Sequence, residues 1–412
     1  MIMGNELPKG WKIQPLKDVV TSMKGKKPKL LSELPFDNSI PYIDIKALEK
    51  DLIEQYADIG SSKSFSPNDI AVVWDGARCG WVAKAKEGAI GSTICALTPL
   101  DIESNYLYYF LLSKYSLVNS KGRGVGIPHI DPTLFWNMEV PIPLPKEQKK
   151  IAEKLDKLFD QIESIKKSTE RIPELLKNFR QQILTYAVTG KLTERWREGN
   201  DLNNEFALIK ADKHRDYNYY VPASWALLSF SNVVTIESNL VNPSEYKDYP
   251  LIAPDNIESM TGRILSKPTV AEIAPISPKH YFNKGSLIYS KIRPYLSKIV
   301  YVDFDGLCSA DMYPLKTKLN IFYLYYYMLS SEFLSFATTA GERIVLPKIN
   351  QKSLNIIPIP VPSLKEQEEI VNRVQSLFSK LDIVEKRYAT LCDILDKLPQ
   401  AILNKAFKGK LL

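Results

Sequence analysis

Positively charged side chains gather in turn-rich stretches of this chain, where they could neutralise a polyanion. Four lysines lie within a single short run, at Lys24, Lys26, Lys27 and Lys29. Lysine and arginine side chains neutralise the phosphates of a nucleic acid backbone, and such contacts hold a protein in register on the duplex. The run therefore predicts a phosphate-contacting loop, with an ordinary solvated loop as the alternative.

Two arginines follow short runs that have the composition of strands. Arg78 ends the segment 74–78, and Lys291 and Arg293 lie in the segment 291–295, which occupies the corresponding place 217 positions later. A guanidinium group pairs well with the edge of guanine in the major groove. Arg78 and Arg293 are therefore candidates for reading bases, and a structural ion pair is the alternative for each.

A third pair of matched segments, 122–130 and 341–349, has glycines and polar residues on a shared apolar frame. The two segments differ most at the positions that carry charge, which suits two modules that read different things. The candidate contact residues in these segments are Arg123, His129, Arg343 and Lys348.

The groups that would carry out a reaction are missing from the sequence. Gly190 and Gly409 are each followed by Lys-Leu rather than by the Lys-Ser/Thr of a phosphate-binding loop. The glycines of 122–126 are too evenly spaced for a dinucleotide fingerprint. The nearest match to the Asn/Asp-Pro-Pro-Tyr/Phe motif of adenine methyltransferases begins at Asn242 and lacks the second proline and the aromatic residue. We therefore predict no catalytic residue and no cofactor bound by this chain.

Metal ligands are not indicated either. The three histidines are far apart, and the four cysteines form no Cys-x-x-Cys pair. Acidic pairs such as Asp255 and Glu258 are expected by chance in a chain with 47 acidic residues. The sequence predicts no metal site.

The elements that must position the basic residues show an internal repeat. Residues 143–192 recur at 362–411, and each copy carries an apolar residue at alternating spacings of four and three. This period places the apolar side chains on one seam of a helix, which requires a partner helix to cover it. We expect the two helices to pair antiparallel as a coiled coil, with ordinary cores of two separate hairpins as the alternative. The seam residues are Ile151, Leu155, Leu158, Ile162, Ile165, Ile370, Val374, Leu377, Leu381 and Val384.

Two longer segments alternate with the helical copies, and each opens on a Pro-x-x-Trp sequence. Short β-rich runs separated by Gly, Pro, Asn and Asp predict an α/β (α+β) globule in each. The predicted order is a first globule, a first helical region, a linker, a second globule and a second helical region, with pseudo-two-fold symmetry. The boundaries are 1–142, 143–192, 193–220, 221–361 and 362–412.

The composition fits this organisation. With 412 residues the chain is long enough for two domains of ordinary size. No uncharged apolar stretch approaches the roughly 18 residues of a membrane span, and a signal-peptide core is missing, so the cytoplasm is the expected location. The formal net charge of +7 permits a polyanionic partner without requiring one.

The order and duplication of these motifs resemble the specificity subunit of a type I restriction-modification system. A Pro-x-x-Trp sequence begins each globule, a Pro-Ile-Pro sequence (141–143 and 358–360) precedes each Lys-Glu-Gln, and Gly-Lys-Leu ends each helical copy. The resemblance covers essentially the whole chain. It implies two target-recognition domains, each of which reads one half of a split target in double-stranded DNA.

The resemblance also implies the partners. The paired helices would set the gap between the half-sites and dock two modification (methyltransferase) subunits, and restriction and translocase subunits would join through the assembled complex. S-adenosylmethionine, ATP and Mg²⁺ are expected on those partners. Two alternatives stay open: a symmetric protein–protein scaffold that does not touch DNA, and an enzyme that modifies or cuts DNA alone.

Overall fold

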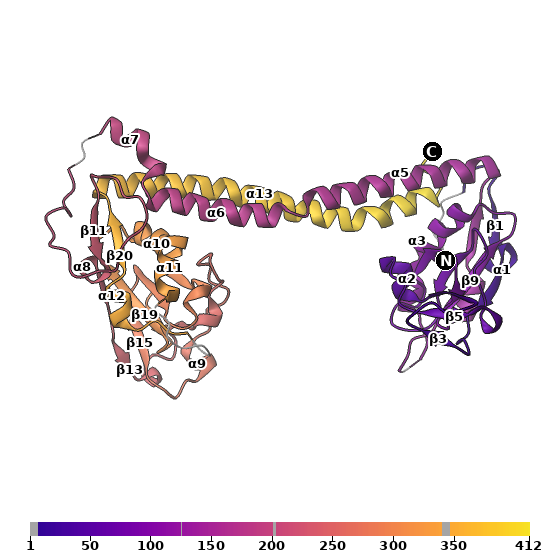
Figure 1. Ribbon diagram of the computed structural model, residues 1–412, viewed down its shortest axis with the longest axis horizontal. Helices are drawn as coiled ribbons and strands as arrows, with labels where there is room; N and C mark the ends of the chain where they lie inside the picture. The colour runs from indigo at the N-terminus through magenta and orange to yellow at the C-terminus, as the bar shows by residue number, and fades with distance from the viewer. Residues whose placement is uncertain (1–6, 125, 201–202, 340–346) are drawn as a thin grey trace. The chain divides into compact units, whose positions relative to one another are not determined.

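The structure is a computed structural model that describes residues 7–124, 126–200, 203–339 and 347–412. The chain divides into two compact units. Unit 1 consists of Met1–Glu170 and Ala389–Leu412, and unit 2 is Arg171–Tyr388. Each unit has a sheet-rich globule and a pair of helix segments, so the predicted mixed α/β fold class is confirmed (Figure 1).

Unit 1 is built on two four-stranded sheets and a separate two-stranded ribbon. The larger sheet has the order β2-β9-β6-β7 and is antiparallel throughout, and the smaller has the order β3-β5-β4-β8 with β4 and β8 parallel. The strands are β1 (Lys12–Pro15), β2 (Val20–Lys24), β3 (Leu31–Ser32), β4 (Ser39–Ile43), β5 (Tyr56–Asp58), β6 (Ile70–Val73), β7 (Val82–Lys84), β8 (Ala89–Ile90), β9 (Ile94–Pro99) and β10 (Glu139–Ile142). The helices are α1 (Leu16–Val19), α2 (Ile45–Lys50), η1 (Ile59–Ser61), α3 (Ser104–Ser120), α4 (Pro132–Trp136) and α5 (Pro145–Thr169).

Unit 2 has the same arrangement of sheets, with one difference in strand order. Its larger sheet, β12-β19-β16-β17, matches that of unit 1, but in its smaller sheet, β13-β15-β18-β14, the parallel pair is β14 and β18, with β14 at the edge. The strands are β11 (Ala226–Ser229), β12 (Val234–Ile236), β13 (Leu240–Val241), β14 (Leu251–Ile252), β15 (Lys279–Phe282), β16 (Ser286–Ser290), β17 (Ile299–Val302), β18 (Gly306–Cys308), β19 (Met312–Thr317) and β20 (Pro358–Val361).

The helices of unit 2 include one that continues into unit 1. They are α6 (Ile172–Val188), η2 (Lys191–Thr193), α7 (Glu194–Glu198), α8 (Phe230–Val233), η3 (Pro243–Glu245), η4 (Pro254–Asn256), α9 (Val270–Ile273), η5 (Pro294–Leu296), α10 (Ile321–Leu329), α11 (Ser331–Thr339), α12 (Gln351–Asn355) and α13 (Leu364–Ala406). The first part of α13 belongs to unit 2 and its last part to unit 1. Among the described residues, no helix is both long and apolar enough to cross a membrane.

In unit 1, α5 pairs with the end of α13 rather than with a helix of its own copy. Lys166 bonds to Asp396 at 2.9 Å, and Lys154 donates to the carbonyl of Leu411 at 2.6 Å. Residue numbers fall along α5 as they rise along α13, so the pair is antiparallel. Figure 1 shows the two helices side by side within this unit.

In unit 2, α6 pairs in the same way with the beginning of α13. Arg180 contacts Glu385 at 3.2 Å, and Arg373 donates to the carbonyl of Leu192 at 2.8 Å. The predicted antiparallel pairing is therefore present within each unit, and each helix takes its partner from the other copy of the repeat.

The seam residues are buried unequally. In unit 1, Ile151 and Leu155 belong to the core of the globule, whereas the side chain of Ile165 is 42% exposed. In unit 2, Val374 is fully buried in the core and Val384 is 44% exposed. The apolar ladder thus serves first as core of each globule and only then as a helix–helix seam.

The two prolines within the helical copies have different effects. The helix of the first copy ends at Thr169 and begins again at Ile172, with Pro173 in its first turn, where the missing N–H is not needed. Pro399 lies inside α13, which continues through it. The expected break therefore occurs at the first proline.

Candidate nucleic-acid interface

Arg78, Arg123 and His129 of globule 1 lie in one place, which we call the first tip and define as the segments 74–80 and 122–130, of which residue 125 lies outside the described residues. The loop after β6 is tied to the second segment by two backbone hydrogen bonds. The N–H of Gly76 donates to the carbonyl of Pro128 at 2.8 Å, and that of Ile130 donates to Trp74 at 3.1 Å. The end of the matched segment, 128–130, is thus joined to the loop after β6.

Globule 2 forms its tip with the same bonds. This second tip comprises 291–297, after β16, and 347–349. The N–H of Arg293 donates to the carbonyl of Pro347 at 2.8 Å, and that of Ile349 donates to Lys291 at 2.9 Å. The two tips therefore share one backbone framework, as the offsets of 217 and 219 in the sequence imply.

A carboxylate contacts two basic side chains at the first tip. Asp75 accepts from Lys24 at 2.8 Å through one oxygen and contacts the Nδ1 of His129 at 2.7 Å through the other. Burial acts to raise the pKa of Asp75, but the hydrogen bonds from Lys24 and His129 outweigh it, so this pKa lies below its usual range. Asp75 is therefore held as a carboxylate between two predicted contact residues.

The two arginines of this region are also paired with acids. Arg78 contacts Glu49 at 2.6 Å. Two guanidinium nitrogens of Arg123 contact a single carboxylate oxygen of Asp131, at 2.8 and 2.6 Å. For Arg78, the structural ion pair that the sequence left open is present. All of these cations keep substantial exposure, so an ion pair here does not prevent contact with another anion.

The lysine run lies beside the first tip, since Lys24 ends β2 and pairs with Asp75. Lys26, Lys27 and Lys29 are exposed, and none of their side chains has a hydrogen bond or ion pair with another described residue. Their ammonium groups are available to a polyanion.

The cations of the second tip are held differently. Lys291 lies over the ring of Tyr313, 5.1 Å from its centre, and donates to the carbonyl of Ala310. Burial, together with the charge of Lys348, lowers the pKa of Lys291. Lys348 itself contacts Asp311 at 3.2 Å. Arg293 is exposed at the start of η5, and Arg343 lies outside the described residues.

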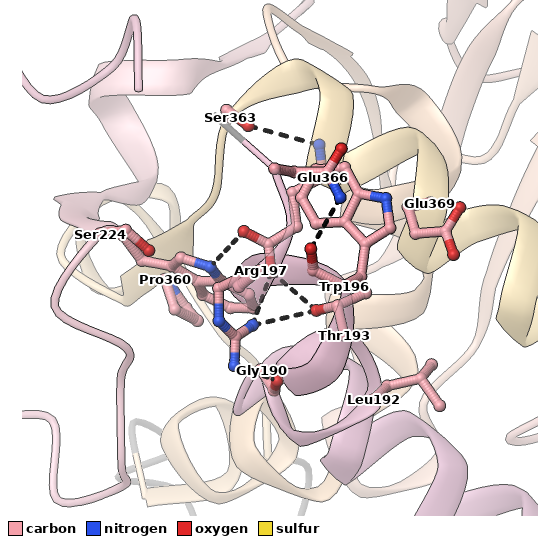
Figure 2. Close-up of polar contacts among 12 residues, drawn as sticks. Gly190, Leu192, Thr193, Trp196, Arg197, Ser224, Pro360, Ser363, Glu366 and Glu369 are labelled. Atoms are coloured by element: carbon pink, nitrogen blue, oxygen red, sulfur yellow. Dashed lines mark hydrogen bonds and ion pairs between the residues drawn. The ribbon is translucent and has the colours of Figure 1, made fainter. Parts of the chain in front are cut away.

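Sequence reasoning missed a polar cluster that fixes the start of α13, which we call the Glu366 lock (Glu366, Trp225, Thr193 and Arg197). The buried carboxylate of Glu366 accepts from the indole of Trp225 at 2.9 Å, from Thr193 at 2.7 Å and from Arg197 at 2.6 Å. Figure 2 shows Arg197 and Thr193 converging on Glu366. Thr193 and Arg197 of this lock lie in the segment 193–220, which the sequence predicts to be a linker.

Unit 1 has a simpler counterpart of the lock. The indole of Trp11 donates to Glu147 at 3.2 Å. The neighbouring Gln148 joins α5 to the globule, because it accepts from the backbone of Glu103 at 2.8 Å and donates to Pro143 at 2.9 Å. The Pro-x-x-Trp and Lys-Glu-Gln sequences are thus two halves of one structural contact, and their repetition was the signal that could have revealed it.

The glycine of each Gly-Lys-Leu sequence lies against the proline of the Pro-x-x-Trp sequence in the same unit. Both glycines have positive φ angles, +75° at Gly190 and +67° at Gly409. A Cβ on Gly190 would lie 2.4 Å from Pro222, and one on Gly409 would lie 2.0 Å from Pro8. These glycines let the helix end approach the proline of Pro-x-x-Trp.

These features define a class of protein: a duplicated α/β binding protein, with the same loop framework in both globules and basic residues at each tip. In the described ranges, no group of three or more His, Cys, Asp or Glu is arranged to hold a metal ion. The family model for the type I restriction modification DNA specificity domain matches residues 8–174 and 227–392. The chain belongs to this family, and the predicted resemblance is confirmed.

Curated relatives agree. The specificity subunit of the type I restriction enzyme EcoDI from Escherichia coli is 42% identical over 321 residues, which are 76% of this chain and 72% of the relative. The EcoKI specificity subunit from Escherichia coli K12 is 27% identical over 454 residues, 98% of this chain and 90% of the relative. As a specificity subunit, the chain recognises target sequences in DNA.

Solved structures show the same fold. A chain from a structure on complex assembly and conformational transition of the type I restriction-modification system has a TM-score of 0.69 at 18% identity, covering 98% of this chain and 100% of that one. The HsdS subunit from Thermoanaerobacter tengcongensis has a TM-score of 0.63 at 17% identity, with 98% of each chain covered.

Proposed function

We propose that each globule reads one half of a bipartite DNA target through its tip. The observation that carries this proposal is the repeated loop framework, in which Gly76–Pro128 and Arg293–Pro347 are the same backbone bond while the side chains around them differ. A shared framework with different side chains lets one fold recognise two different sequences.

The proposed contacts divide by chemistry. Lys24, Lys26, Lys27 and Lys29 are assigned to phosphates, where charge matters more than direction. The residues of the tips are assigned to base edges or to the phosphates beside them. These are Arg78, Arg123, His129, Lys291, Arg293 and Lys348. Arg343, which the sequence assigns to the same kind of contact, lies outside the described residues.

The helix pairs have a different role in the proposal. They set the gap between the half-sites and offer docking surfaces to two modification subunits, and restriction and translocase subunits join the assembled complex. Methyl transfer, translocation and cleavage, with S-adenosylmethionine, ATP and Mg²⁺, belong to those partners, and this chain is not an enzyme. No observation favours the alternative of a scaffold without DNA.

The test is to map methylated adenines across a genome with this chain present and absent, together with its modification subunits. We expect a bipartite motif with a fixed gap that appears only when the chain is present. Exchange of globule 1 or globule 2 for that of a relative should change one half of the motif and leave the other unchanged.

Three results would contradict the proposal: a motif with one contiguous element, a change of both halves after one exchange, or methyl transfer by the purified chain alone. A matched control keeps both globules and replaces the exposed Lys352, which lies outside both tips, by Ala. This variant should give the unchanged motif.

A further inference from the structure

We propose that Arg293 reads a guanine in the second half-site and that its backbone is held in an unfavourable conformation for this purpose. The inference rests on the proposed function, which it makes specific to one residue and one base. It starts from the backbone of the second tip, where the loop imposes a conformation that arginine rarely adopts.

Arg293 has a φ of +49° and a ψ of +57°, which is the left-handed helical region. Residues with a Cβ avoid this region, and Asn and Asp are the usual exceptions. Among the described residues other than glycine with positive φ, four are Asn or Asp and the other four are Met260, Ala274, Arg293 and Ser297. Pro294 follows and further narrows the conformations open to residue 293.

The first tip shows which residue type suits this backbone position. Gly76 is the counterpart of Arg293, because the N–H of Gly76 donates to Pro128 as the N–H of Arg293 donates to Pro347. Gly76 has a φ of +108°. Glycine adopts such angles without steric cost. The second tip therefore has an arginine where the same framework is better served by glycine.

The loop that holds Arg293 is fixed on several sides. The hydroxyl of Ser290 donates to the carbonyl of Ile292 at 3.1 Å, and the ammonium of Lys298 donates to Pro254 at 2.7 Å. The backbone of Met260 donates to Leu296 at 3.2 Å. A rigid loop presents a side chain at a defined angle, which a bidentate contact to a base requires.

The arginine itself is exposed and contributes little to this rigidity. Within the described ranges, no residue forms a hydrogen bond or ion pair with its guanidinium, whereas Arg78 and Arg123 both have acidic partners. The unfavourable backbone conformation of Arg293 therefore does not serve a contact between its side chain and another described residue. It indicates that the side chain binds a partner molecule. A guanidinium fork matches the O6 and N7 acceptors of guanine.

The experiment uses the complex assembled with modification subunits and compares Arg293→Gly with the wild type. We expect the melting temperature to stay the same or rise by about 2 °C, because glycine relieves the backbone. Affinity for the cognate duplex should fall about 5-fold to 150-fold, the range for one bidentate base contact. The methylation map should lose one guanine from the second half of the motif and keep the first half.

Two further variants separate the effect of the backbone conformation from the effect of the guanidinium group. Ala274→Gly relieves a second left-handed residue, at a φ of +46°, away from the tip; it should match the thermal effect and leave the motif unchanged. Arg293→Lys keeps the charge without the fork, so the guanine should still be lost.

Several outcomes would overturn the inference. They are an unchanged motif in Arg293→Gly, an equal loss of affinity for all sequences, a fall in melting temperature that explains the loss, and full recognition by Arg293→Lys. Failure of the proposed function would show separately, because the wild-type complex would then give no chain-dependent motif.

Discussion

The first tip and the second tip differ in how they hold their cations, although their backbones make the same hydrogen bonds. At the first tip, His129, Arg78, Arg123 and the neighbouring Lys24 each contact a carboxylate. At the second, Lys348 contacts Asp311, Lys291 lies over an aromatic ring, and the guanidinium of Arg293 has no partner among the described residues. Carboxylates fix the direction of a cation and reduce its net charge. The repeated backbone thus sets where contact residues stand, and the side chains alone set what they present.

The contacts that hold each globule together are likewise partly shared and partly different between the two units. Tyr106 donates to Pro141 at 2.7 Å and Tyr323 donates to Pro360 at 2.5 Å, so the aromatic helix is anchored alike in both globules. The locks are unequal, because Glu366 is buried with three partners while Glu147 accepts one long bond in a partly exposed place.

The largest effect that we predict tests this inequality. Glu366→Ala leaves the largely buried guanidinium of Arg197 without its carboxylate, although Arg197 keeps its bonds to Thr193 and to the carbonyl of Gly190. This change should lower the free energy of unfolding by about 3 kcal/mol. Glu147→Ala removes one hydrogen bond and should cost about 1 kcal/mol. Urea unfolding of the purified chain, followed by tryptophan fluorescence and circular dichroism, measures both. Equal losses would contradict the difference between the locks.

A second effect concerns the apolar ladder. Leu155 is fully buried in the core of unit 1, and Leu155→Ala should cost about 3 kcal/mol, since truncation leaves a cavity. Ile165→Ala, ten residues further along α5, should cost less than about 1 kcal/mol because that side chain is already exposed. The same unfolding measurement applies, and a larger loss at Ile165 would show that the seam is covered there by something else.

Much of this architecture could be predicted from the sequence, because a repeat shows the same physical constraint twice. The spacing of the ladder revealed the helices, and the offset between Gly76 and Arg293 revealed which loops correspond. The sequence left an ion pair open for Arg78, but its partner, Glu49, could not be predicted, because the partner depends on which side chains of different loops meet. The role of Arg197 was missed for the same reason: it lies in a segment without period, and its acceptor, Glu366, is far away in sequence.

The smallest effects that we predict concern the ion pairs at the two tips, and the larger of these is at the first tip. The pKa of Asp75 in the folded chain lies below the ordinary value of 3.8, so its ion pairs stabilise the fold above that pH and are lost as the pH falls through the lowered pKa. Asp75→Asn should therefore cost about 0.5 kcal/mol at pH 7, an amount limited by the exposure of Lys24. The difference in free energy of unfolding between wild type and variant should shrink as the pH falls below about 4.

Asp311→Asn is the matched variant of the second tip. The ion pair between Asp311 and Lys348 is longer than that of Asp75 with Lys24, and both of its side chains are about half exposed. The loss of unfolding free energy caused by Asp311→Asn at pH 7 should therefore be smaller still. Asp75 contacts both Lys24 and His129, whereas Asp311 pairs with Lys348 alone. Asp75→Asn should therefore also increase binding of random duplex DNA by the assembled complex more than Asp311→Asn does, with the excess disappearing at high salt. Equal responses of the two tips, in stability and in binding, would mean that carboxylates restrain both sets of cations alike.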